Sequence, residues 1–246
     1  MPAITIPGGA STPELNAHLA VPPVGDGPWP AVVVLHEAFG LTDDIRQQAD
    51  RLAAAGYLAV APSLYSAGGW RCIQATFRSL LRGGGGTALA DIEATRAWAA
   101  THADATGRVG VIGFCMGGGF ALLTAGSGFD VAASNYGMLP KQLDETLRGA
   151  CPVVGSYGGK DRELPGAAGK LEAALSRAGV EHDVKEYPDA GHSFLNRHNL
   201  GPASPLLRVI GVGYDGASAE DAWGRILRFF ATHLSAPANT QVRSAT

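Results

Sequence analysis

The 246-residue sequence has few cysteines, little net charge and no long apolar run. Its three cysteines, Cys72, Cys115 and Cys151, are widely spaced and include no C-x-x-C pair, so the sequence predicts neither a disulfide framework nor a zinc site. A net charge of −3 provides no basic excess for binding nucleic acid or an anionic membrane. No run reaches the ~18 apolar residues of a membrane span, and the first residues do not form a signal peptide. These absences favour a cytoplasmic protein.

The composition that is present, 46% hydrophobic and 17% charged residues, is ordinary for a globular protein of the size of an enzyme. The length fits one large α/β domain, which we expect to span residues 1–234. The last residues, 235–246, are mostly small or polar and are predicted to be a flexible tail.

Apolar runs typical of buried strands alternate with helical patterns along the chain. This alternation predicts a doubly wound, mostly parallel sheet with helices on both faces, and an antiparallel hairpin at residues 3–7 and 16–21 forms its edge. Strands are expected at 31–35, 57–62, 108–113, 131–135, 151–157 and 182–187, helices at 42–55, 88–101, 167–178 and 217–234, and a glycine-rich connector at 83–86.

The segment Gly113-Phe114-Cys115-Met116-Gly117 matches the G-x-S-x-G nucleophile elbow, with cysteine in place of serine. It follows the apolar run 109–112 and precedes a predicted helix, which is the strand–turn–helix context that this motif requires. Most cysteines are inert core residues, but this setting would expose the Cys115 sulfur at the carboxyl end of the sheet. The motif therefore predicts a nucleophilic thiol.

Two loops downstream of the elbow contain candidate partners for that thiol. Asp161 follows the strand predicted at 151–157, and His192 follows the next strand, so both loops open at the same edge of the sheet as Cys115. Their order matches the nucleophile–acid–histidine order of hydrolases with this elbow. Asp161 would orient the imidazole and His192 would transfer the proton.

Four segments together, 36–40, 113–117, 159–161 and 190–194, resemble the dienelactone hydrolase family of α/β-hydrolases. The resemblance covers about residues 3–234 and implies an α/β-hydrolase fold that hydrolyses a small carboxylic ester or lactone through a Cys115–His192–Asp161 triad and a thioester. It further implies an oxyanion hole formed by the backbone N–H groups of Ala38 and Met116. It also implies that Glu37 masks the thiol in the resting enzyme. His36 is interpreted as a supporting residue.

The sequence departs from this family where the substrate is recognised. Relatives that open dienelactone hold its carboxylate with two arginines, and one of these positions is Asn196 here, with Arg197 next to it. Neither Arg71, Arg78 nor Arg82 clearly matches the other arginine, so an anionic dienelactone is a doubtful substrate. Candidate residues of the substrate pocket are Phe39, Tyr65, Trp70, Arg71, Arg78, Tyr136, Phe194 and Arg197.

Two other motifs are misleading. His36-Glu37 is not a zinc motif because Gly40 occupies the second histidine position, and the G-x-G-x-x-G pattern at 211–216 has no later strand for a dinucleotide site. The sequence thus calls for no metal or cofactor. The alternatives left open are a thioesterase or acyltransferase with the same triad, and a non-catalytic small-molecule or thiol-redox binding protein that retains the elbow. Neither the natural substrate nor the oligomeric state follows from the sequence.

Overall fold

A computed structural model describes residues 3–81, 86–197 and 213–235. Arg82, residues 83–85 of the connector, residues 211–212 of the glycine motif and residues 236–246 of the predicted tail lie outside these residues. Within the described part, no helix combines the length and the apolar character needed to cross a bilayer.

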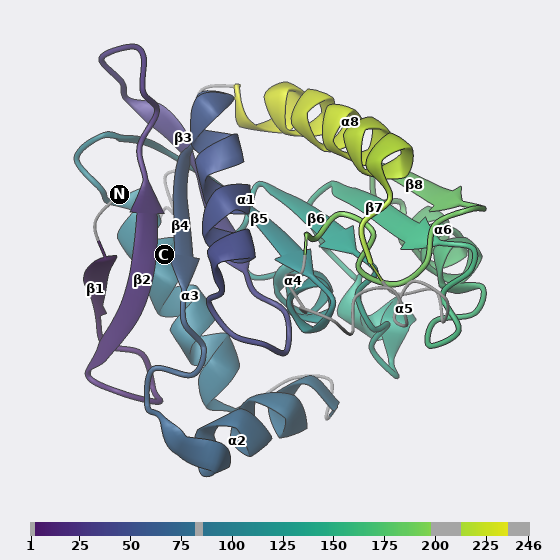
Figure 1. Cartoon of the computed structure of the whole chain (residues 1–246), viewed down its shortest axis with the longest axis horizontal. Coiled ribbons are helices and arrows are strands. Elements are labelled where there is room, and N and C mark those ends of the chain that lie inside the picture. The colour runs from purple at the N-terminus through teal and green to yellow at the C-terminus, as the bar shows by residue number, and fades with distance from the viewer. Residues whose placement is uncertain (1–2, 82–85, 198–212, 236–246) are drawn as a thin grey trace, which may run out of the picture.

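The described strands form one sheet in the order β1-β2-β4-β3-β5-β6-β7-β8 (Figure 1). β1 pairs with β2 and β2 with β4 in antiparallel register, and the other neighbours are parallel. The predicted edge hairpin and mostly parallel sheet are therefore confirmed. The bounds are β1 (Ala3–Pro7), β2 (Glu14–Ala20), β3 (Trp29–Leu35), β4 (Leu58–Pro62), β5 (Ala105–Phe114), β6 (Val131–Asn135), β7 (Val153–Gly158) and β8 (His182–Tyr187).

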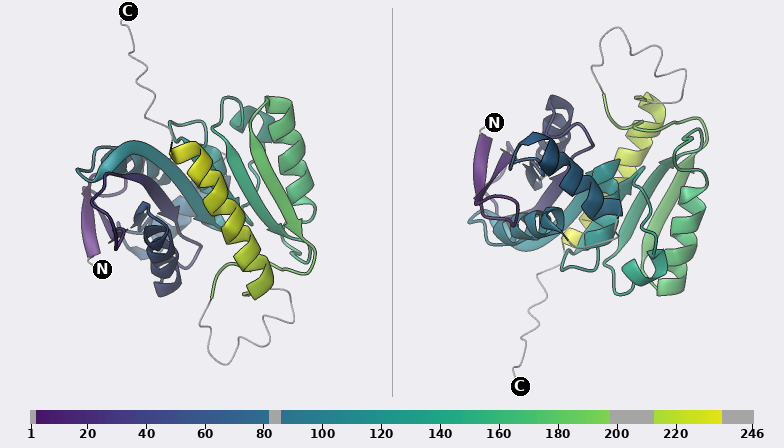
Figure 2. Two further views of the ribbon diagram at one scale, coloured as in Figure 1. Left: turned by 90° about the horizontal axis from the view of Figure 1, so that it is seen from above. Right: turned by 90° about the horizontal axis from the view of Figure 1, so that it is seen from below.

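Helices cover both faces of this sheet, as predicted (Figures 1 and 2). The apolar side chains of β3 show why: Val33 and Leu35 enter one core, whereas Val32 and Val34 enter the other. Alternation along a strand buried on both faces thus supplies two cores. α1 (Asp43–Ala54) and α8 (Gly216–Leu234) cover one face, whereas α3 (Thr87–Ala100), α4 (Met116–Thr124) and α6 (Ala167–Ala178) cover the other.

Local signals explain the bounds of the predicted helices. The Thr42 side chain accepts a hydrogen bond from the N–H of Ile45 at the start of α1, and Asp215 caps α8 by accepting from Ser218. α6 ends at Gly179, whose φ of 67° is readily available to glycine. Each of these helices begins or ends within one or two residues of its predicted position.

Two helices were not predicted. α2 (Gly69–Leu81) begins at the second of two glycines with positive φ and has no acidic residue in its first turn, so its sequence carries no start signal. α5 (Leu143–Thr146) is a single turn, too short to show a helical period.

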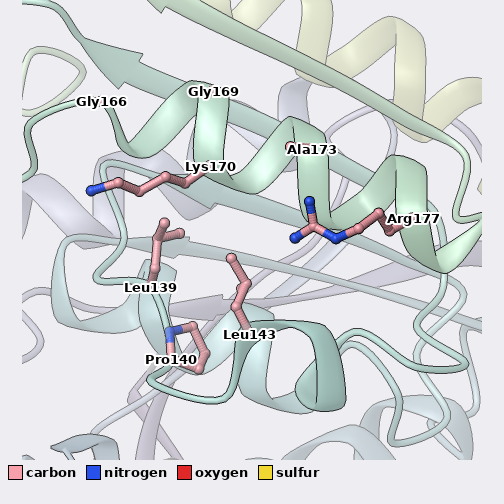
Figure 3. Close-up of a pocket in the computed structure, with 8 residues that line it drawn as sticks. All are labelled: Leu139, Pro140, Leu143, Gly166, Gly169, Lys170, Ala173 and Arg177. Atoms are coloured by element: carbon pink, nitrogen blue, oxygen red, sulfur yellow. The ribbon is translucent and has the colours of Figure 1, made fainter.

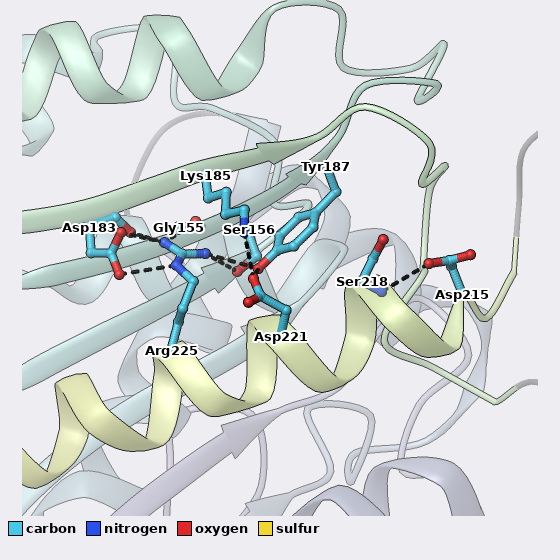
Figure 4. A network of polar contacts seen from close by, with 9 residues as sticks. All are labelled: Gly155, Ser156, Asp183, Lys185, Tyr187, Asp215, Ser218, Asp221 and Arg225. Carbon is cyan, nitrogen blue, oxygen red and sulfur yellow. Dashed lines mark hydrogen bonds and ion pairs between the residues drawn. The ribbon is translucent and has the colours of Figure 1, made fainter.

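α8 is fastened to the last two strands through the buried side chain of Arg225 (Figure 4). Its guanidinium donates to both carboxylate oxygens of Asp183 at 2.6 and 3.0 Å, and to the hydroxyl of Tyr187 at 3.2 Å. Tyr187 in turn donates to Asp221, which also pairs with Lys185 at 2.7 Å. This network fixes the end of β8, from which the loop carrying His192 departs.

Candidate active site

The elbow between β5 and α4 places Cys115 in a strained backbone conformation. Its φ of 52° and ψ of −114° are rare for a residue with a side chain. The flanking glycines are needed because the backbone is crowded. A Cβ on Gly113 would lie 1.9 Å from the carbonyl oxygen of Gly117, and a Cβ on Gly117 would lie 2.2 Å from that of Leu35. This geometry is the tight strand–turn–helix expected from the motif.

Asn135, at the end of β6, holds both sides of the elbow. Its side-chain amide donates to the carbonyl of Gly113 at 3.2 Å, and its own carbonyl accepts from the N–H of Cys115 at 3.1 Å. The sequence did not single out Asn135. The available signal was the polar pair Ser134-Asn135, which ends the short strand predicted at 131–135.

Asp161 and His192 meet as predicted from their loops. Nδ1 of His192 lies 2.7 Å from Oδ2 of Asp161, and both residues are buried. The other oxygen of Asp161 accepts from the N–H of Glu163 at 2.9 Å. Burial would raise the pKa of Asp161, but the hydrogen bond and charge of His192 lower it below its usual value. The carboxylate is thus ionised and orients the imidazole.

The Cys115 sulfur also affects the pKa of the His192 imidazole. Burial alone would lower the pKa of His192, but its interactions with Asp161 and then Cys115 raise it from 6.5 to about 10. Nε2 is buried and makes no well-aligned hydrogen bond within the described residues. Hydrogen bonds between a catalytic base and its nucleophile are often long or poorly aligned before substrate binds. The arrangement favours a protonated imidazole beside the sulfur.

A chain of buried, hydrogen-bonded side chains packs against the imidazole of His192. The Tyr136 ring packs 5.2 Å from the imidazole, and its hydroxyl donates to Asn196, whose amide donates to Asp44. Asp44 also accepts from the N–H of Arg197 at 2.7 Å. Asn196 is fully buried, so the residue at the position of the relatives' arginine is part of this internal chain.

Glu37 is buried two residues after the end of β3 and accepts a hydrogen bond from the Ser193 hydroxyl at 2.8 Å. Ser193 has a φ of 59° and directly follows His192, so the bond joins the Glu37 loop to the histidine loop. Tyr136, which has a φ of 40°, is near both Glu37 and Cys115. Burial first, and then the charges of Glu37, Asp44 and Cys115, raise the pKa of this phenol well above its usual value.

The candidate oxyanion residues lie on two neighbouring segments. Ala38 follows the end of β3, and Met116 is the first residue of α4. The side chain of Cys115, the N-cap residue of α4, makes no capping hydrogen bond, and the first N–H groups of any helix lack partners within it. The N–H of Met116 is therefore suited to an anionic ligand. The Tyr65 hydroxyl donates to the carbonyl of Ala38 at 3.0 Å and also lies 3.5 Å from the Met116 sulfur.

The other residues predicted for the pocket differ in exposure. Tyr136 and Phe194 are fully buried and pack against each other, whereas Phe39 and Trp70 are exposed. Arg71 and Arg78 are exposed on α2. Arg197 is exposed, stacks on the Tyr214 ring at 4.1 Å and donates to its hydroxyl at 2.7 Å.

A separate groove of about 640 Å³ lies between α5 and α6 (Figure 3). Lys170 and Arg177 extend from α6 beside apolar residues of the opposite wall, and Arg177 pairs with Asp144 at 2.6 Å. The groove includes none of the residues predicted for the site. Its lining consists of Leu139, Pro140, Leu143, Gly166, Gly169, Lys170, Ala173 and Arg177.

Comparisons with known proteins agree on one family. The sequence profile of the dienelactone hydrolase family matches residues 15–234. A Yersinia pestis relative named "Putative carboxymethylenebutenolidase" is 33% identical over 237 residues, covering 89% of this chain and 84% of the relative. An Escherichia coli K12 relative of the same name is 34% identical over 234 residues, covering 88% and 82%. The crystal structure titled "Putative Dienelactone Hydrolase" from Klebsiella pneumoniae has a TM-score of 0.73 at 29% identity, covering 94% of this chain and 99% of that one.

Proposed function

The chain belongs to the dienelactone hydrolase family and is a carboxylic ester hydrolase, and we propose that Cys115, His192 and Asp161 hydrolyse a small ester or lactone through a thioester. The observation that carries this proposal is the 2.7 Å His192–Asp161 contact beside a cysteine at a strained elbow. These are the parts that nucleophilic acyl transfer requires: a nucleophile, a proton carrier and a group that orients the carrier.

Acylation begins with the Cys115 thiolate and the protonated His192. The sulfur attacks the ester carbonyl, and the N–H groups of Ala38 and Met116 stabilise the resulting oxyanion. When the C–O bond breaks, His192 gives its proton to the departing alkoxide. The products of this half-reaction are a free alcohol, a thioester on Cys115 and a neutral imidazole. For a lactone, the alcohol stays attached to the acyl group.

Deacylation reverses these roles. The neutral His192 accepts a proton from water as the water oxygen attacks the thioester, and the sulfur leaves as thiolate. The acid product departs, and the thiolate and protonated imidazole are restored. Asp161 remains ionised in both halves and stabilises the charged imidazole.

We assign Glu37 the masking role implied by the family resemblance. Its buried carboxylate, held by Ser193, disfavours a second negative charge on the nearby sulfur. Before substrate enters, it therefore shifts the thiolate–imidazolium pair toward the thiol and neutral imidazole, which reduces oxidation of the sulfur. Substrate entry then has to shift Cys115 from the thiol to the thiolate form.

Glu37→Gln should raise the rate of Cys115 alkylation by iodoacetamide about tenfold at pH 7, since a neutral amide no longer opposes thiolate formation. Glutamine retains an oxygen that can accept from Ser193. The measurement is the alkylation rate against pH, with the exposed Glu181→Gln as the matched control. An unchanged profile in Glu37→Gln would show that the carboxylate is only structural.

The thioester itself provides the direct test of the proposed function. Rapid acid quenching of the enzyme during turnover of p-nitrophenyl acetate should yield protein carrying one acetyl group, removable by hydroxylamine and located on Cys115 by peptide mass spectrometry. Steady turnover after this burst is expected for a hydrolase. Transfer of the acetyl group to an added alcohol or amine in preference to water would favour an acyltransferase, and absence of the adduct would contradict the proposed mechanism.

A further inference from the structure

His36 is buried between two loops and uses both of its ring nitrogens. Nδ1 lies 2.6 Å from the carbonyl oxygen of Glu37, and Nε2 accepts from the N–H of Leu64 at 3.0 Å. Burial lowers its pKa to about 4, so the ring is neutral at ordinary pH. Because Nε2 is an acceptor, the single ring proton is on Nδ1 and is donated to Glu37.

This bond determines where the next N–H points. In a trans peptide the C=O and N–H groups point in opposite directions. The carbonyl of Glu37 is held by His36 and also by the N–H of Gly40 at 3.1 Å. The N–H of Ala38, in the same peptide unit, is therefore directed away from His36.

Tyr65 holds the following peptide unit. Its hydroxyl donates to the carbonyl of Ala38 at 3.0 Å, and its ring lies 4.9 Å from the ring of His36. Burial, followed by the charges of Cys72 and Cys115, raises its pKa to about 12, so the phenol keeps its proton. The same hydroxyl contacts the Met116 sulfur at 3.5 Å, which connects the two candidate oxyanion residues.

We propose that His36 and Tyr65 are positioning residues that fix the peptide units on either side of Ala38, so that the N–H of Ala38 is preorganised as an oxyanion donor. This inference rests on the proposed function, because it requires an oxyanion to form at Cys115. Neither side chain touches the reacting atoms in this role. Each acts through the backbone of Ala38.

The alternative state that these contacts prevent is a flipped Glu37–Ala38 peptide. A flip would exchange the N–H of Ala38 for the carbonyl oxygen of Glu37 and would present a negative dipole to the developing oxyanion. It would also leave the buried Nδ1 of His36 without its acceptor, which opposes the flip. The buried His36 and the half-buried Tyr65 thus favour the orientation suited to catalysis.

The test compares two reactions of the same sulfur. Acylation by p-nitrophenyl acetate passes through an oxyanion, whereas thiolation by methyl methanethiosulfonate contains no carbonyl. Tyr65→Phe and His36→Gln should each slow acylation by about 10²-fold, the effect of a small misplacement of a catalytic group. Thiolation should change by less than about threefold, since the nucleophile is unaltered. The loss should appear in kcat with KM nearly unchanged.

The matched controls are Tyr57→Phe, where the ring packs against Phe230, and His18→Gln, where the ring pairs with Asp50. Both should acylate at the wild-type rate. Tyr65→Phe retains the ring, so it keeps the test decisive if His36→Gln does not fold. Equal slowing of both reactions, or unchanged acylation in Tyr65→Phe, would overturn the positioning role of these residues and leave the proposed function intact. Failure of wild-type enzyme to acylate at Cys115 would refute the proposed function as well.

Discussion

Replacement of Cys115 by alanine is expected to lower kcat/KM for p-nitrophenyl acetate by about 10⁴- to 10⁶-fold, because it removes the atom that forms the proposed thioester. His192→Ala should cause a loss of similar size, since no other group would protonate the leaving alkoxide or activate water. The double variant should be little worse than either single variant, because residues that act as a unit are not additive. Steady-state kinetics of the three variants test this expectation.

Cys151→Ala is the matched control for this experiment. Burial, and then the nearby Asp130, raises the pKa of the Cys151 thiol to about 12, so it does not form a thiolate at neutral pH. This variant should keep wild-type activity. Retention of more than about a hundredth of the activity in Cys115→Ala would mean that another residue is the nucleophile.

Gly117→Ala is expected to destabilise the protein by about 4 kcal/mol or more, which is a large part of the stability of a typical domain. A Cβ at this position would lie 2.2 Å from the carbonyl oxygen of Leu35 and 2.8 Å from that of His36. Both obstacles are backbone atoms, so no side chain can rotate to make room. α4 would have to move away from β3, which would also displace the N–H of Met116.

Urea unfolding of Gly117→Ala measures this cost, and Gly169→Ala provides the control. Gly169 lies in α6, and a Cβ there would meet no atom within 4 Å. Alanine should therefore stabilise α6 by about 0.5–1 kcal/mol through its higher helix propensity. Similar free energies of unfolding for the two variants would contradict the close packing of α4 on β3.

The fold followed from the sequence because the central strands are apolar on both faces. A run such as 31–35 is typical of a strand in a parallel sheet covered on both sides, and capping residues such as Thr42 and Gly179 mark helix ends. α2 was missed because it starts at Gly69 without a capping signal.

Only part of the candidate site could be predicted from the sequence. Asp161 and His192 could be paired because they follow neighbouring parallel strands, and the structure brings them into contact. The roles of Asn135, Ser193 and Asn196 depend on which backbone groups lie within reach, and that follows from tertiary packing. Spacing in the sequence has no information on such contacts.

The strained backbone at Cys115 has a consequence for engineering. Within the described residues, the non-glycine residues with positive φ are Cys115, Tyr136 and Ser193, and all three lie in or beside the candidate site. Such conformations cost about 1–3 kcal/mol each. Glycine substitutions chosen for thermal tolerance alone would therefore relieve strain at these positions, and would remove the thiol, the support of the imidazole or the partner of Glu37. Stabilising designs for this fold should leave those three positions unchanged and seek their gains elsewhere.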